Sequence, residues 1–177
     1  MSPKLDANLC ADYPLIFQDR NKPMNQTAMC WGFSCGDGWY NIIDTLCRLL
    51  TSEYRAAESQ YEYWKTMIGK PCFGTNGDIV TQESVDARKA KMEELAAKVP
   101  VASQVKEKFG GLRFYVQGAT EKHWAYITFA ESMSHRTCEE CGAPGETYTD
   151  GWHATLCEAH AKEMGRTKRI EDDEDAD

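Results

Sequence analysis

The sequence has no long hydrophobic run. Among its 177 residues, 42% of which are hydrophobic, there is no stretch of about eighteen apolar residues, and this excludes a membrane-spanning helix. The first residues, Met1 to Asp6, lack the apolar segment of a secretory signal peptide. The composition instead predicts a globular protein, long enough for one domain with a core and a small additional module.

Familiar catalytic motifs are also missing. The chain has no glycine-rich loop that would cradle a phosphate, no His-Glu-x-x-His and no Ser-His-Asp signature. Outside the cluster described next, the histidines are His123, His135 and His153, and none stands in a recognisable pairing with a nucleophile. The sequence therefore identifies no catalytic residues, and it favours a protein that is not an enzyme.

Three of the eight cysteines stand in two tight pairs with a histidine. Cys138-Glu-Glu-Cys141 is followed, after fifteen residues, by Cys157-Glu-Ala-His160. A Cys-x-x-Cys turn and a Cys-x-x-His at the start of a helix each deliver two donors to one point, which suits tetrahedral Zn²⁺. His153 is an alternative fourth ligand, but His160 has the better spacing.

The residues around these pairs support a zinc module. Gly142 permits a tight turn after Cys141, residues 147–155 predict a hairpin turning at Asp150-Gly151, and a helix is expected from Thr155. This order is typical of a treble clef or a zinc ribbon. Four protein ligands leave no open position for water, so one structural zinc ion per chain is expected.

The other five cysteines form no visible disulfide framework; they are Cys10, Cys30, Cys35, Cys47 and Cys72. An odd number of scattered thiols beside a zinc site indicates a reducing, cytoplasmic environment. A second metal site among the first four is a weaker hypothesis, because their spacing matches no standard knuckle.

The net charge of −8 is concentrated at one end. Six acids lie in residues 171–177, so the rest of the chain is nearly neutral. Such a block predicts a disordered, solvated tail. The alternative is that the tail competes for a basic surface.

Hydrophobic periodicity predicts an α+β fold, in which helices pack on a small antiparallel hairpin or sheet. A domain over residues 1–134 precedes the zinc module, residues 135–170, and the tail. The elements expected in that domain are a helix over about 37–68, with a break possible near Thr51-Ser52, a helix over about 82–98, a hairpin over 101–117 and a helix over about 121–134.

The expected hairpin turns at Gly110-Gly111. This register places Phe109 opposite Leu112 and Lys108 opposite Arg113, and it leaves Glu107 on the apolar face, where it needs a partner. One face then carries a candidate binding surface, which we call the basic face: Lys106, Lys108, Arg113 and Tyr115. Cations beside an aromatic ring suit phosphates and bases, although the same pattern is typical of a solvated sheet face.

Cys35-Gly-Asp-Gly-Trp39 places a thiol before a helix. A nucleophile in a pocket formed with Asp37 and Glu107 would define a small hydrolase or a nucleotide-handling enzyme. A tight turn with a buried Cys35 explains the same residues and is favoured.

Several phrases resemble an uncharacterised protein family of bacteriophages and bacterial genomes: residues 31–40 (WGFSCGDGWY), residues 104–116 (QVKEKFGGLRFYV), residues 138–145 (CEECGAPG), and Gly151-Trp152 with Thr155-Leu-Cys157 and His160. The resemblance covers most of residues 12–162. It implies a small cytoplasmic protein of the bacterial host, encoded by phage or prophage DNA, and it implies no reaction. We therefore expect a non-enzymatic protein that binds a host or phage protein, in host takeover or counter-defence. Nucleic-acid binding through the basic face is the alternative.

Overall fold

The computed structural model describes residues 1–71 and 77–167. Cys72 and the predicted acidic tail lie outside the described residues. Contacts divide the chain into two compact units: Met1–Arg48 with the described residues from Pro100 onward, and Leu49–Val99. The sequence placed a boundary near residue 134, whereas these contacts group the C-terminal module with the N-terminal segment and the hairpin.

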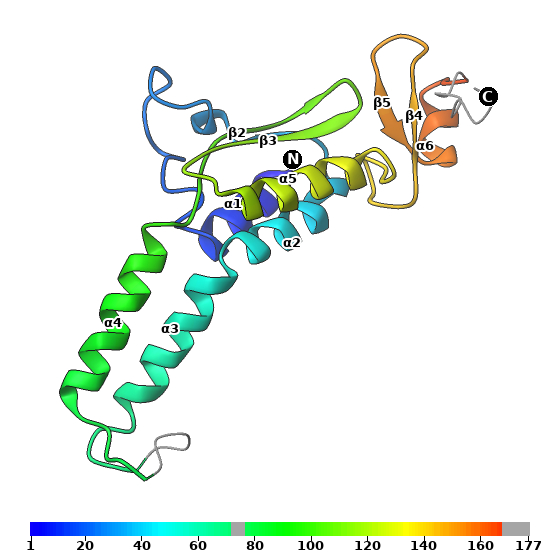
Figure 1. The fold of residues 1–177 in the computed structure, drawn as a ribbon. Coiled ribbons are helices and arrows are strands. Elements are labelled where there is room, and N and C mark those ends of the chain that lie inside the picture. Colours follow the sequence, from blue (N-terminus) through cyan, green and yellow to red (C-terminus); the bar gives the residue numbers. More distant parts are fainter. Residues whose placement is uncertain (72–76, 168–177) are drawn as a thin grey trace. The chain divides into compact units, whose positions relative to one another are not determined.

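The described fold is α+β, as predicted, with six α-helices and two small sheets (Figure 1). The α-helices are α1 (Pro3–Asp12), α2 (Tyr40–Leu50), α3 (Ser52–Lys65), α4 (Gln82–Ala96), α5 (Glu121–Ser134) and α6 (Glu158–Glu163). The strands are β1 (Phe33–Ser34), β2 (Val101–Lys108), β3 (Gly111–Gln117), β4 (Glu146–Tyr148) and β5 (Ala154–Leu156). Two short 3₁₀ turns are η1 (Met29–Trp31) and η2 (Asp37–Trp39).

The predicted helix over 37–68 is divided. It begins as the 3₁₀ turn η2, continues as α2 and is interrupted at Thr51, whose φ of −101° and ψ of 1° leave the helical region. The Ser52 hydroxyl donates to the Leu49 carbonyl at 2.8 Å, which satisfies one of the acceptors that the end of α2 leaves open. The possible break near Thr51-Ser52 is therefore present.

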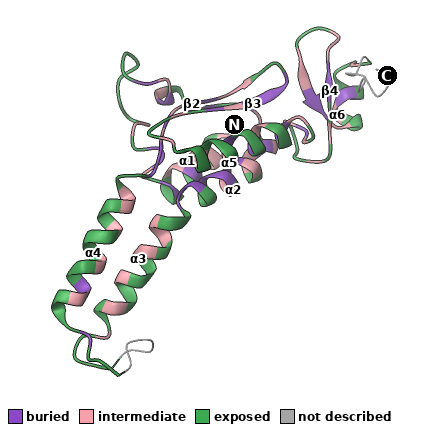
Figure 2. Ribbon diagram, in the orientation of Figure 1, coloured by how far each residue is buried: buried purple, intermediate pink, exposed green. Residues whose placement is uncertain are grey.

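In the first unit, the three-stranded sheet has the order β1-β2-β3. β1 pairs with β2 in parallel, an addition that the sequence did not predict, and β2 pairs with β3 as the expected antiparallel hairpin. Phe17 bridges these strands, because its ring lies 5.0 Å from that of Phe33 and 6.3 Å from that of Phe114. Buried residues of the sheet and of the neighbouring helices form the core (Figure 2).

The hairpin turn lies one residue earlier than predicted, and this shifts the pairing of the strands by two residues. Lys108 lies opposite Gly111, and Lys106 lies opposite Arg113, so the expected Lys108–Arg113 and Phe109–Leu112 pairs are wrong. Phe109 and Gly110 form the turn with φ values of 56° and 77°, which is the backbone of a type I′ turn. Phe109, which was expected opposite Leu112, is exposed.

The second unit consists of α3, α4 and their connection. α4 is held at its start by a capping box, in which Thr81 and Ser84 exchange hydrogen bonds of 3.2 Å between side chain and backbone. A small cluster around Val80 and Val85 forms its core, and the Arg88 guanidinium lies 3.0 Å from the centre of the Trp64 ring.

Candidate metal centre

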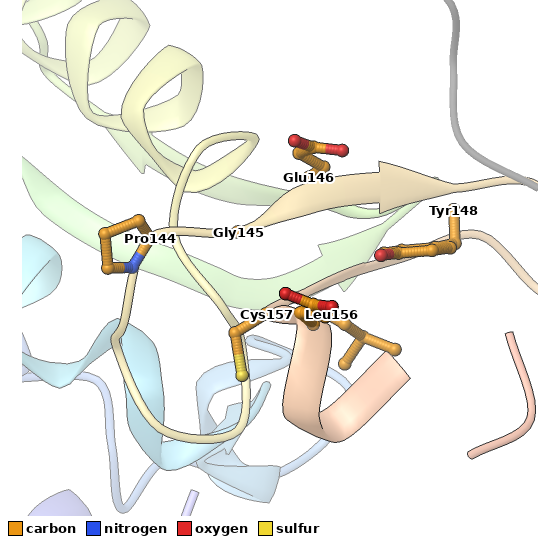
Figure 3. A pocket seen from close by; sticks show the side chains of 7 residues that line it. Pro144, Gly145, Glu146, Tyr148, Leu156 and Cys157 are labelled. Atoms are coloured by element: carbon orange, nitrogen blue, oxygen red, sulfur yellow. The ribbon is translucent and has the colours of Figure 1, made fainter. Parts of the chain in front are cut away.

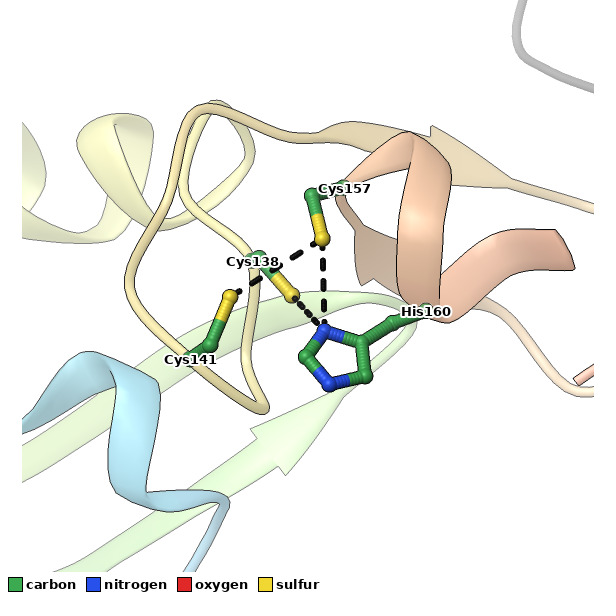
Figure 4. A group of neighbouring side chains, drawn as sticks. All are labelled: Cys138, Cys141, Cys157 and His160. Atoms are coloured by element: carbon green, nitrogen blue, oxygen red, sulfur yellow. Dashed lines mark hydrogen bonds between the residues drawn. The ribbon is translucent and has the colours of Figure 1, made fainter. Parts of the chain in front are cut away.

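The first two candidate ligands lie in a tight turn, residues 137–144, which we call the knuckle. The Cys138 amide donates to the Ala143 carbonyl at 2.8 Å, and the Gly142 amide donates to the Cys138 carbonyl at 2.9 Å. Gly142 has a φ of 78°, a left-handed conformation that glycine adopts without strain. The chain therefore folds back within four residues, and Cys138 and Cys141 present their sulfurs to one point (Figure 4).

The other two candidate ligands lie where β5 meets α6. Cys157 is the extended N-cap residue of α6, and His160 lies within that helix. The antiparallel pairing of β4 with β5 brings this helix start beside the knuckle, where the Glu139 amide donates to the Thr155 carbonyl at 2.9 Å. Local sequence thus forms each pair, and the β4–β5 hairpin brings the pairs together.

The four donor atoms converge from both pairs. His160 Nδ1 lies 3.2 Å from Cys157 Sγ and 3.5 Å from Cys138 Sγ, and Cys141 Sγ lies 3.8 Å from Cys157 Sγ. All four donor atoms lie within 4.8 Å of one another. The predicted residues Cys138, Cys141, Cys157 and His160, the Cys₃His cluster, are therefore close enough to hold a metal ion.

Two thiols of the cluster have shifted pKa values. Burial raises the pKa of the Cys138 thiol. A hydrogen bond from the backbone amide of His160 is the main cause that lowers the pKa of Cys157 to about 7. Backbone amides at the start of α6 thus favour the thiolate, which is the form that binds metal.

The segment around Asp37 contacts the knuckle directly. The Gly38 amide donates to the Glu139 carbonyl at 2.7 Å, and the Gly36 amide donates to the Glu139 carboxylate at 2.8 Å. The indole nitrogen of the fully buried Trp39 donates to the Thr137 carbonyl at 2.8 Å. The N-terminal segment is therefore fastened to the backbone of the candidate metal centre.

Glycine is required at positions 36 and 38 because the backbone there lies against the backbone of the knuckle. A Cβ atom on Gly38 would lie less than 3.0 Å from backbone atoms of Cys138, Glu139 and Gly142, and one on Gly36 would lie equally close to Glu139. Sequence reasoning missed this role. The available signal was a pair of glycines beside a tryptophan, which is compatible with close backbone packing as well as with a turn.

The residues proposed for an enzyme pocket have other roles. Cys35 is buried, and burial raises the pKa of its thiol to about 12, which opposes formation of a nucleophilic thiolate. Asp37 accepts a hydrogen bond from the Ser2 amide at 2.5 Å, which is the main cause that lowers its pKa. Glu107 accepts from the Gly110 amide at 2.7 Å and from the Trp152 indole at 3.3 Å, so the partner that its position required is present.

The pocket in Figure 3 lies in the C-terminal module and has a volume of about 220 Å³. Its lining residues are Pro144, Gly145, Glu146, Tyr148, Leu156, Cys157 and Glu158. It therefore adjoins the Cys₃His cluster through Cys157 and contains none of Cys35, Asp37 and Glu107.

The basic face is formed by alternate residues of β2 and β3. Lys106 lies opposite Arg113, Lys108 follows on the same side of β2, and Tyr115 follows on the same side of β3. The Lys106 ammonium lies 5.8 Å from the centre of the Tyr115 ring. Among the described residues, no carboxylate lies within 4.0 Å of the charged groups of Lys106, Lys108 and Arg113.

No protein-family model, curated protein or solved structure matches the chain. The relation to phage proteins therefore remains an expectation from the motifs quoted above. Within residues 1–71 and 77–167, none of the helices is long and apolar enough to cross a lipid bilayer.

Proposed function

We propose that the Cys₃His cluster binds one structural Zn²⁺ per chain in a treble-clef-like module. Tetrahedral zinc, with bonds of about 2.3 Å to sulfur and about 2.0–2.1 Å to nitrogen, separates its donor atoms by about 3.5–3.8 Å. The distances of 3.5 and 3.8 Å between donor atoms fall in that range, and the distance of 3.2 Å from His160 Nδ1 to Cys157 Sγ is about 0.3 Å shorter. Four protein donors fill the shell, so the ion would fasten the knuckle to α6.

Zinc content tests this proposal. Protein purified without added metal is expected to contain about one Zn²⁺ per chain by elemental analysis, and a Cys157→Ser variant is expected to contain far less because a hydroxyl is a poor zinc ligand. Cys10→Ser is the matched control, since Cys10 lies outside the cluster. Metal-free wild-type protein that is still folded, or equal zinc in both variants, would contradict the assignment.

For the protein as a whole, we propose a non-enzymatic binding function. The observation that supports it best is the basic face, where three cations on one side of a hairpin have no ion pair with the described residues. Opposite charges across an interface steer two partners together and disfavour partners of the same charge, so the face suits an acidic partner surface. From the resemblance in its motifs, we propose a host or phage protein as that partner and the cytoplasm of a bacterial host as its location.

Nucleic acid is the second candidate. Tyr115 lies beside Lys106 on the basic face, and an exposed aromatic ring beside cations stacks bases while the cations bind phosphates. Three cations provide few phosphate contacts, so this binding would be weak at physiological salt.

One capture experiment separates the two candidates. Immobilised protein is incubated with lysate of phage-infected bacteria, and replacing Lys106, Lys108 and Arg113 by alanine is expected to reduce capture at least tenfold, roughly the loss of several interfacial charge contacts. A partner that remains after nuclease treatment supports protein binding, whereas a nuclease-sensitive one supports nucleic acid.

The matched control replaces three lysines of the second unit by alanine. Lys89, Lys91 and Lys98 each lie within 4.0 Å of a glutamate, so their ammonium groups are already paired. This variant changes the net charge by the same amount and is expected to retain the partner. Capture that is equal for both triple variants would show that the basic face does not bind it.

A further inference from the structure

The turn between β2 and β3 carries an exposed aromatic ring at a strained backbone position. Phe109 has a φ of 56°, and it alone has a positive φ among the described residues other than glycine. The first position of a type I′ turn favours asparagine, aspartate or glycine, because other L-residues adopt the left-handed conformation at an energetic cost. Burial does not offset this cost, since the side chain is 61% exposed. The fold therefore gives no reason for a phenylalanine here, and strain of this kind is typical of functional sites.

A second exposed ring lies beside this turn, in the loop between β4 and β5 (Figure 1). Trp152 is 77% exposed, and its indole nitrogen donates to the Glu107 carboxylate at 3.3 Å. The Trp152 carbonyl accepts from the Arg166 guanidinium, which fastens the backbone of the loop. The ring of the next residue, His153, lies 6.2 Å from that of Phe109, centre to centre. These contacts hold three rings together, which we call the aromatic tip: Phe109, Trp152 and His153.

The aromatic tip adjoins the basic face. The Lys108 ammonium lies 5.2 Å from the centre of the Phe109 ring, just as the Lys106 ammonium lies 5.8 Å from that of Tyr115. Two cations and two rings therefore follow one another along the hairpin, and the loop that carries Trp152 adjoins the last of these rings.

Alternating cations and exposed rings suit a single strand of nucleic acid. The phosphates of such a strand bind cations, and its unpaired bases stack on rings. A duplex offers mainly its phosphates, because its bases are already stacked and paired inside the helix. An acidic protein surface would use the cations, but it does not explain why cations and rings alternate.

We propose that the aromatic tip and the basic face form one platform for single-stranded nucleic acid. Phe109 and Trp152 each stack a base, and the three cations of the basic face bind phosphates. This inference rests on the second candidate function above, nucleic-acid binding, and adds the single-stranded form of the ligand and the rings that recognise it. The rings supply what three cations lack, since stacking adds affinity that does not depend on the release of counterions.

Binding of oligonucleotides at several salt concentrations tests the two parts of the platform separately. Full-length protein, with Zn²⁺ in the buffer, is titrated against fluorescent oligo-dT and oligo-U by anisotropy, from about 50 to about 200 mM salt. Three phosphate contacts predict a slope of about −2 when the logarithm of the binding constant is plotted against that of the salt concentration. Phe109→Leu and Trp152→Leu are each expected to weaken binding about tenfold at every salt concentration and to keep this slope. Replacing Lys106, Lys108 and Arg113 by alanine is instead expected to bring the slope close to zero.

Three controls separate stacking from other effects. Phe129→Leu is the matched ring variant, since Phe129 is 65% exposed but lies on α5, outside the platform; it is expected to bind like the wild type. A duplex of oligo-dT with oligo-dA is expected to bind more weakly than oligo-dT, because paired bases cannot stack on the rings. Phe109→Asn separates binding from folding. Asparagine suits the left-handed position, so the thermal midpoint is expected to stay equal or rise while the affinity for oligo-dT falls about tenfold.

The platform is wrong if both leucine variants at the tip bind oligo-dT like the wild type while the alanine variant does not; nucleic-acid binding by the basic face would then stand without the rings. It is equally wrong if the duplex binds as tightly as the single strand. If the wild type binds neither oligo-dT nor oligo-U at about 50 mM salt, the platform and the nucleic-acid candidate are both wrong. Loss of a captured protein in the Phe109→Leu variant would then assign the aromatic tip to a protein partner.

Discussion

Removal of the proposed Zn²⁺ by a chelator is expected to unfold the C-terminal module, residues 137–166, while α3 and α4 keep their structure. The hydrophobic cluster of the module has four buried residues, Cys138, Tyr148, Leu156 and Ala161, which are too few to order it alone. Structural zinc contributes about 10–16 kcal/mol to the folding of comparable small modules, more than such a cluster supplies. Loss of the ion therefore leaves β4, β5 and α6 without the link that joins them to the knuckle.

Amide hydrogen exchange measures this effect at individual bonds. After chelation, the amides of Cys138, Glu139 and Gly142 are expected to lose their protection, because each donates to a carbonyl within the module. The amides of Val85 and Ala97, which donate within the second unit, serve as internal controls and are expected to stay protected. Added Zn²⁺ should restore the first set. Full protection of the knuckle in metal-free protein would show that the cluster is not a structural clamp.

The Cys₃His cluster was predictable from sequence because its determinants are local. Each ligand pair spans four residues, Gly142 supplies the turn after Cys141, and Cys157 opens a helix that carries His160. Geometry within one turn of chain decides where these donors point, and no distant contact is needed to form either pair. For the same reason, α5 begins and ends at the expected residues, with Thr120 as its N-cap.

The hairpin register was not predictable, because distant residues decide it. Gly111 lies in β3 rather than in the turn, and a Cβ atom there would lie less than 3.0 Å from the His135 ring. The carbonyl of Gly110 accepts a hydrogen bond of 2.6 Å from the Thr155 hydroxyl in β5. Two adjacent glycines predict a two-residue turn, but here one serves the turn and the other makes room for a side chain from the end of α5. Phe109 then takes the left-handed position that a second glycine would normally occupy.

Distant residues also explain why Gly36 and Gly38, on either side of Asp37, are glycines. Their sequence context indicated a turn before a helix, and they do lie there. Their need to be glycine comes from the knuckle about a hundred residues later, whose backbone lies against them. The candidate metal centre is therefore more than a C-terminal feature, since the segment just before α2 is fastened to its backbone.

Replacing Gly38 by alanine is expected to lower the free energy of unfolding by about 2–3 kcal/mol, a typical cost of overpacking a site whose neighbours cannot move aside. The added methyl group would lie less than 3.0 Å from the carbonyl oxygen of Cys138 and the nitrogen of Gly142, and these are backbone atoms rather than flexible side chains. The same two atoms form the hydrogen bond that closes the knuckle. The variant should therefore also release its metal to a chelator about tenfold faster, a change equivalent to about 1.4 kcal/mol.

Gly118→Ala is the matched control for the metal-release measurement. Gly118 has a φ of 75° and no atom within 4 Å of an added Cβ, so the substitution strains the backbone without touching the knuckle. It is expected to lower the free energy of unfolding by about 1–2 kcal/mol, the cost of a left-handed alanine, and to leave the rate of metal release unchanged. Similar release rates in the two variants would mean that the ion responds to overall stability alone. A faster rate confined to Gly38→Ala would instead show that the segment before α2 holds the knuckle in its metal-binding form.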